Sequence, residues 1–129
     1  MANQRDDGNY ITIWKRPFDV HIQTYIYFFV HSIHMDLTKY STPSIAQKRA
    51  NAYFGHTVRL YRSTRKEKKY QIKDPSGKWI HFGQMGYQDF TKHKDSMRRK
   101  RYLTRATKIH GNWKSNPYSA NNLAIHILW

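Results

Sequence analysis

The sequence contains no cysteine, and it has few acidic residues. Without cysteine the chain can form no disulfide, no thiolate metal site and no cysteine nucleophile, and the absence fits a reducing compartment. The most apolar stretch, Val20–Val30, is too short to span a bilayer and contains His21 and Gln23. Residues 1–9 are polar and include acids, so they predict no signal peptide.

The scarcity of acids leaves a strong positive charge. Eight Asp and Glu face 23 Lys and Arg, for a net charge of +15. Residues 48–114 carry this excess, because they hold nineteen of the bases and four of the acids. Self-repulsion on this scale destabilises a compact state unless counter-charge is near. The block therefore predicts a partner that is nucleic acid, acidic lipid or an acidic protein surface, since solubility needs far less charge.

Length and composition predict one α+β domain over residues 1–129. A chain of 129 residues leaves little room for two domains, and its 39% hydrophobic and 16% aromatic residues supply a core. We expect a short antiparallel sheet with one or two packed helices. Within this one domain, residues 41–129 are expected to form the basic α+β core, and residues 1–40 form its N-terminal segment. The aromatic-rich segments 1–30 and 117–129 are expected to pack on the core or contact other chains.

Local patterns predict the individual elements. Apolar or alternating runs predict strands at Tyr10–Trp14, Tyr25–Val30, His56–Tyr61, Lys69–Lys73, Lys78–Phe82 and in the tail from Leu123. The Asp74–Gly77 segment, Asp-Pro-Ser-Gly, predicts a hairpin turn. A hydroxyl and a proline near Ser41 predict a helix that runs to Phe54 and ends at Gly55.

The clearest helix is Asp95–Ile109. One face is expected to be buried: Tyr102, Leu103, Ala106, Ile109 and His110. A second, basic stripe lies beside it: Arg98, Arg101, Arg105 and Lys108. Asp95 is the helix's only acid, so we expect a partner outside the helix to supply negative charge to this stripe.

The basic residues are the strongest chemical signal. Between Arg59 and Lys73 they interleave with apolar and aromatic side chains, a pattern that suits phosphates and stacked bases as well as an acidic protein surface. The residues expected to bind an acidic partner or phosphate are Arg62, Arg65, Lys66, Lys68, Lys69, Arg98, Arg99, Arg101, Arg105 and Lys108.

Catalytic signals are weak. The sequence has no glycine-rich phosphate cradle and no nucleophile-elbow motif. His31 and His34, and likewise Asp89 and His93, have helical spacing, but no third zinc ligand stands at a suitable distance in sequence. We expect no metal, no cofactor and no enzyme activity. The alternative is a Mg²⁺-dependent nuclease that uses Asp89, His93 and Asp95.

Three stretches carry a resemblance to a known group of proteins. They are VRLYRSTRKEKKYQIKDPSGKWIHFG from Val58, GYQDFTKHKDSMRRKRYLTRATK from Gly86, and NWKSNPYSANNLAIHILW from Asn112. As a set, they resemble a family of small basic virion proteins of nucleocytoplasmic large DNA viruses, the chlorella-virus and mimivirus-like group. Residues 1–40 carry no equivalent signal. The resemblance offers no catalytic residue to transfer.

The resemblance implies a structural protein of the virion capsid. The expected function is that of a minor capsid, or cement, protein on the inner face of the capsid, made in the host cytoplasm. Its expected partners are the major capsid protein and other minor capsid proteins. The alternative is a virion protein that binds nucleic acid and neutralises packaged DNA, and contact with an inner membrane surface also stays open.

Overall fold

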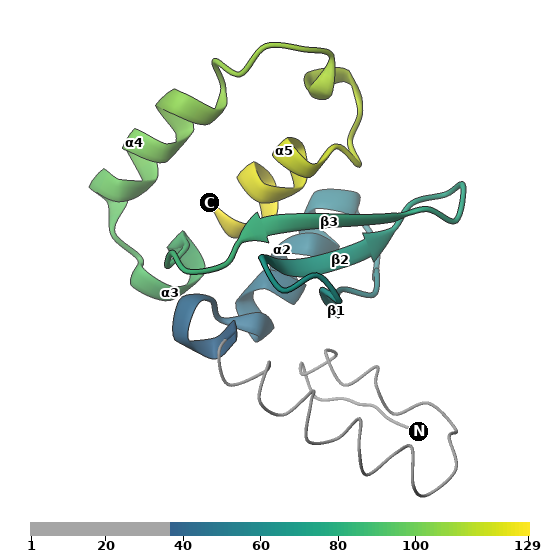
Figure 1. Ribbon diagram of the computed structural model, residues 1–129, viewed down its shortest axis with the longest axis horizontal. Helices are drawn as coiled ribbons and strands as arrows, with labels where there is room; N and C mark the ends of the chain where they lie inside the picture. The colour runs from purple at the N-terminus through teal and green to yellow at the C-terminus, as the bar shows by residue number, and fades with distance from the viewer. Residues whose placement is uncertain (1–36) are drawn as a thin grey trace, which may run out of the picture.

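The structure, a computed structural model, describes residues 37–129 (Figure 1). The predicted strands at 10–14 and 25–30, and the pair His31 and His34, lie outside the described residues. The described chain is α+β, as predicted, with one three-stranded antiparallel sheet in the order β1-β2-β3. Its elements are α2 (Pro43–Phe54), β1 (Tyr61–Arg62), β2 (Lys68–Lys73), β3 (Trp79–Gln84), α3 (Phe90–His93), α4 (Ser96–Ala106), a 3-10 turn η3 (Trp113–Ser115), α5 (Ala120–Leu123) and a π-helical turn η4 (Ala124–Leu128).

The central hairpin forms as predicted. Strands β2 and β3 pair antiparallel with Tyr70 opposite Phe82 and Ile72 opposite Ile80. The Asp74 carboxylate holds the turn, because its Oδ1 accepts hydrogen bonds from the backbone N–H groups of Ser76 and Lys78, each at 2.9 Å. A side chain that satisfies turn amides in this way is the reason Asp favours turns.

Strand β1 is much shorter than the predicted strand at His56–Tyr61. The backbone of residues 58–60 pairs with side chains of α2 instead of a neighbouring strand. Gln47 donates to the carbonyl of Val58 at 2.8 Å and accepts from the N–H of Leu60 at 3.2 Å. Asn51 accepts from the N–H of Val58 at 2.9 Å. These amides satisfy the backbone groups that a strand would have used.

The tail from Leu123 is helical, so the predicted strand there is wrong. Ser119 caps α5, with its Oγ accepting from the backbone N–H of Asn122 at 3.2 Å. Leu123, Ile127 and Leu128 are completely buried. Their spacing is that of a helical stripe, and this periodicity outweighs the β-propensity of the isoleucines. The segment 117–129 therefore packs on the core, as expected.

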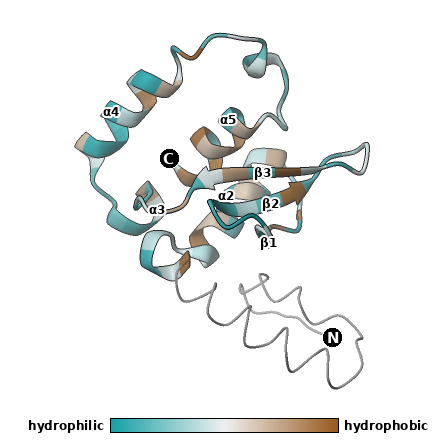
Figure 2. Ribbon diagram, viewed as in Figure 1, coloured by the Kyte–Doolittle hydropathy of each residue, from teal (hydrophilic) through white to brown (hydrophobic). Residues whose placement is uncertain are grey.

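The core lies between the hairpin, α2 and the C-terminal helical segment. Tyr70 and Phe82 from the hairpin meet Leu60 and the C-terminal residues in one cluster. Figure 2 shows brown hydrophobic segments in the hairpin and the C-terminal segment, whereas α4 is mostly teal. Within residues 37–129, no helix is long and apolar enough to cross a bilayer.

Helix α4 is shorter than the predicted helix, and its apolar face is less buried. Ala106 is buried, whereas Tyr102 and Leu103 are half-buried, and Ile109 and His110 are exposed beyond the end of the helix. In Figure 1, α4 stands away from the hairpin and the chain arches from its end towards α5. The prediction of a buried face fails because the helix ends before Ile109, because Tyr102 borders an open cleft, and because Leu103 lies on the outer side of α4.

Candidate functional site

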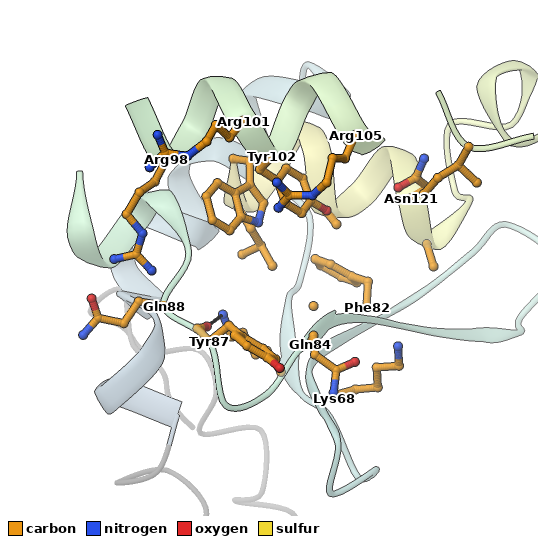
Figure 3. Close-up of a pocket in the computed structure, with 17 residues that line it drawn as sticks. Lys68, Phe82, Gln84, Tyr87, Gln88, Arg98, Arg101, Tyr102, Arg105 and Asn121 are labelled. Atoms are coloured by element: carbon orange, nitrogen blue, oxygen red, sulfur yellow. Dashed lines mark hydrogen bonds between the residues drawn. The ribbon is translucent and has the colours of Figure 1, made fainter. Parts of the chain in front are cut away.

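A basic cleft of about 620 Å³ lies between α4, the end of the hairpin and the C-terminal segment (Figure 3). A volume of this size is typical of ligand sites. We call this feature the basic cleft. It is lined by Lys68, Lys69, Phe82, Gly83, Gln84, Tyr87, Gln88, Arg98, Arg101, Tyr102, Arg105, Ile109, Ala120, Asn121, Ala124, Leu128 and Trp129.

One wall of the cleft is helix α4. Asp95 begins the helix, since its carboxylate accepts hydrogen bonds from the backbone N–H groups of Met97 and Arg98. These bonds hold the pKa of Asp95 below its usual value. Arg98, Arg101 and Arg105 are exposed and line the cleft from this one helix, as Figure 3 shows. Three of the four residues of the predicted basic stripe therefore form a wall of the cleft, whereas Lys108 follows the end of α4 and does not line it.

The opposite wall is formed by the end of β3 and the loop that follows it. Gln84, Tyr87 and Gln88 line it, together with Lys68 from β2 (Figure 3). Lys69 holds this loop from below, because its ammonium donates to the carbonyl of Tyr87 at 2.6 Å. The polar side chains of this wall therefore stand on a loop whose backbone is hydrogen-bonded to the buried ammonium of Lys69.

The floor of the cleft is apolar and aromatic. Phe82 and Leu128 are fully buried beneath it. Tyr102 of α4 stacks on Trp129, with ring centroids 4.2 Å apart and an interplanar angle of 8°. Gly83 lets Leu128 pack closely against β3, since a Cβ at this position would lie 2.7 Å from Cδ1 of Leu128. The cleft therefore offers cations on its walls and an apolar surface at its base.

The charge of the cleft is of one sign. Among the described residues that line it are five cations and no Asp or Glu. Only Lys69 has an ion-pair partner in the described part of the chain, the carboxylate of Asp89 at 3.1 Å. Neighbouring like charges on a helix repel, so Arg98, Arg101 and Arg105 favour an anion that binds between the walls. The arrangement can bind carboxylates or phosphates.

Two predicted binding residues lie in the interior, which corrects the sequence-based prediction. Arg62 is 3% exposed, and its Nη1 donates to the carbonyls of Ser63, Lys68 and Lys69. Lys69 is 2% exposed and belongs to the ion pair with Asp89. A buried cation needs such partners, and these contacts make both side chains structural.

The remaining predicted residues divide between the cleft and the outer surface. Lys68, Arg98, Arg101 and Arg105 come together in the cleft. Arg65, Lys66 and Lys108 are exposed but do not line it. Arg99 is half-buried, with its Nε donating to the backbone oxygen of Trp129 at 2.5 Å and its guanidinium 5.3 Å from the Phe90 ring. Arg99 therefore fastens α4 to the C-terminal segment.

Sequence reasoning missed the uncharged half of the cleft. Gln84 at the end of β3, the loop residues Tyr87 and Gln88, and the floor residues Tyr102 and Trp129 were not predicted as site residues. Gly83, near the end of β3, and Gly86, in the loop that follows, are the local signal for a tight connection there. No local pattern predicts the stacking of Tyr102 on Trp129, because the partners come from separate segments.

The three candidate nuclease residues have structural contacts. Asp89 is fully buried and bonded to Lys69 and Thr91. Asp95 caps α4, and its backbone N–H donates to Nδ1 of His93 at 2.8 Å. Within residues 37–129, no three His, Asp or Glu side chains are grouped so that they could hold a metal ion.

Residues 58–106, less than half of the chain, are similar to a family of unknown function (DUF5754). This span contains the hairpin, α3 and α4, and therefore both walls of the basic cleft, whereas the floor residues Leu128 and Trp129 follow it. No curated protein and no solved structure matches the chain.

Proposed function

We propose that this chain is a non-enzymatic structural protein of a large double-stranded DNA virus, a minor capsid protein that docks on acidic groups of its capsid neighbours. The basic cleft is the docking site. Its partners are the major capsid protein and other minor capsid proteins. The resemblance of residues 58–129 to small basic virion proteins supports the viral setting, and the cleft supports the mode of binding.

The observation that carries the proposal is the uncompensated charge of the cleft. Arg98, Arg101 and Arg105 are exposed on one helix, and no described acid lines the cleft with them. Arginine guanidinium groups bind carboxylates in bidentate pairs, so a neighbour's Asp or Glu side chains complement this wall. Such pairs set the register between two proteins and speed their encounter.

The test is incorporation into particles. Tagged chains are expressed during infection, and their amount in purified particles is measured for the wild type and for Arg101→Ala with Arg105→Ala. The double variant should fold almost normally, because exposed changes usually cost less than about 0.5 kcal/mol. Its incorporation should fall, and it should fall further as salt is raised, because screening weakens the remaining charge pairs.

The control is a second double variant with the same charge change, Lys66→Ala with Lys100→Ala. Both lysines are exposed, neither lines the cleft, and Lys100 is on the outer side of α4. This variant should enter particles at the wild-type level. An equal fall in incorporation for the two double variants would show that net charge alone matters. Normal incorporation of the arginine variant would contradict the proposal.

A second candidate is binding of nucleic acid inside the virion. The observation that favours it is the proximity of aromatic rings to the arginines, since Tyr87, Tyr102 and Trp129 all line the cleft. This function predicts that the free protein binds DNA with a salt slope of about 0.9 per phosphate contacted. It also predicts loss of the chain from genome-free particles, whereas a capsid-docking protein stays with empty capsids.

A further inference from the structure

The basic cleft has the length of a short extended peptide. Arg98 and Arg105 are seven residues apart on α4, so the basic wall is about 10 Å long at 1.5 Å per residue. An extended chain advances about 3.3 Å per residue and turns every second side chain to the same side. Two acidic side chains with one residue between them would therefore lie about 7 Å apart, within the length of this wall.

The mouth of the cleft also carries exposed apolar side chains. Three large hydrophobic side chains in the described part of the chain are strongly exposed, and two of them, Tyr87 at 68% and Ile109 at 53%, line the cleft. Tyr87 comes from the loop wall, and Ile109 follows α4. Exposed apolar groups beside a concave site mark contact with a ligand's apolar surface.

The rings of the cleft do not form a row on which successive bases could stack. Tyr102 and Trp129 stack on each other at 4.2 Å, so each ring already covers one face of the other. His93 lies a further 5.2 Å from Trp129 at an angle of 54°. Only Tyr87 is a strongly exposed ring among the cleft residues. Single-strand binding grooves instead present several open rings along a long basic track.

We propose that the basic cleft receives one short extended segment of a partner protein, in which two acidic side chains flank an apolar one. The carboxylates bind the arginines of α4, and the apolar side chain, which points to the opposite side of an extended chain, packs against Tyr87 on the loop wall. This inference rests on the proposed function, because it names the part of the capsid neighbour that enters the cleft.

The test uses fluorescein-labelled peptides and the full chain, with binding followed by fluorescence anisotropy at low ionic strength. The probe peptide has a Glu-Leu-Glu core flanked by Gly and Ser, and its controls have Gln-Leu-Gln or Glu-Gly-Glu cores. We expect the Gln-Leu-Gln peptide to bind at least about tenfold more weakly, since charged hydrogen bonds are lost. The Glu-Gly-Glu peptide should also bind more weakly, because its apolar contact is missing.

Variants of the chain test whether the Glu-Leu-Glu peptide binds in the basic cleft. Arg101→Gln with Arg105→Gln should weaken the Glu-Leu-Glu peptide about tenfold or more. The matched pair Lys66→Gln with Lys100→Gln should change its affinity less than about twofold, as expected for exposed charges outside the site. Tyr87→Ser should remove the preference for Glu-Leu-Glu over Glu-Gly-Glu.

Three outcomes would overturn the inference. The first is equal weakening by the lysine and arginine pairs, which would indicate diffuse attraction. The second is equal affinity for the Leu and Gly peptides. The third is that an oligothymidylate of about twelve nucleotides binds more tightly than the Glu-Leu-Glu peptide and that this binding depends on Arg101 and Arg105. That result would assign the cleft to nucleic acid.

Particle incorporation separates this inference from the proposed function. If incorporation depends on Arg101 and Arg105 but not on Tyr87, the capsid-docking function stands and insertion of a segment fails. If the Glu-Leu-Glu peptide binds as expected while the arginine variant enters particles normally, the peptide site stands and the capsid function fails.

Discussion

The ammonium of Lys69 donates a hydrogen bond to Oδ2 of Asp89 at 3.1 Å, with both side chains closed off from solvent. Lys69 also donates to the carbonyls of Tyr40 and Tyr87. Burial lowers the pKa of Lys69, and the charge of Asp89 opposes this shift. The pair joins β2 to the loop before α3, and so holds the polar wall of the basic cleft in place.

Breaking the pair from one side should destabilise the chain strongly. Lys69→Met or Asp89→Asn alone leaves one buried group without its partner, and we expect a loss of about 3–5 kcal/mol in the free energy of unfolding. The double variant should lose less than the sum, because no uncompensated charge is left. Urea denaturation measures these values, with the exposed Lys66→Met as the control. Strictly additive losses would show that the two side chains are not coupled.

Gly83, near the end of β3, should tolerate replacement less well than Gly86 in the loop that follows. Both have positive φ, at +85° and +99°, so alanine strains the backbone at either position by about 1–2 kcal/mol. At Gly83 the new Cβ would also meet Leu128 at 2.7 Å and Lys69 at 3.1 Å. A Cβ added at Gly86 would meet no atom of a residue other than its chain neighbours within 4 Å. Thermal or urea unfolding should show an additional loss of about 1–3 kcal/mol for Gly83→Ala. Equal losses for the two variants would mean that Leu128 and Lys69 shift enough to make room for the new Cβ at position 83.

Replacing a side chain by alanine should cost less free energy of unfolding on the outer side of α4 than in the core. The sequence alone predicts a buried Leu103, with a loss of about 2–5 kcal/mol for Leu103→Ala. Because the structure leaves Leu103 half-buried, we expect a smaller loss, below about 2 kcal/mol. Ile127 is completely buried, so Ile127→Ala should cost the full 2–5 kcal/mol or so. Urea denaturation of the two variants checks the order, and a reversed order would contradict the packing of α4.

The stability of the chain should fall as the pH drops below neutrality, in part through His93. Burial first, and then the positive charge of Arg98, lower the pKa of His93 below its ordinary value of 6.5. The unfolded chain therefore binds the proton more readily than the folded chain. The stabilising contribution is complete above about pH 6.5 and is lost as the pH falls towards the lowered pKa. Protonation would also remove the Nδ1 acceptor for the N–H of Asp95.

Urea denaturation at pH 7.5 and pH 5 measures this effect. His93→Gln should make the free energy of unfolding less dependent on pH in this window. Burial also lowers the pKa of His81, so His81→Gln should flatten part of the same slope. The exposed His110→Gln is the control and should leave the slope unchanged. An unchanged slope for His93→Gln would show that its protonation is not coupled to folding.

Elements with local signals could be predicted from the sequence alone. Asp74 and Gly77 specify the hairpin turn, Pro43 and Gly55 bracket α2, and Asp95 begins α4. These signals act within a few residues, through side-chain caps and the permitted φ angles. The helical spacing likewise predicts Arg98, Arg101 and Arg105 on one face, and in the structure all three line the cleft from α4, which the sequence did not predict.

Properties that depend on distant partners were decided only by the tertiary structure. Arg62 and Lys69 look like their exposed basic neighbours in sequence, yet backbone carbonyls and Asp89 stabilise them in the interior. The tail after Leu123 becomes a helix because α2 and the hairpin bury its apolar stripe, and Trp129 lines the cleft stacked on Tyr102 of a separate segment. Charge and periodicity are properties of the chain itself. Burial of a charge, and the concave shape of a cleft, arise only when separate segments pack together.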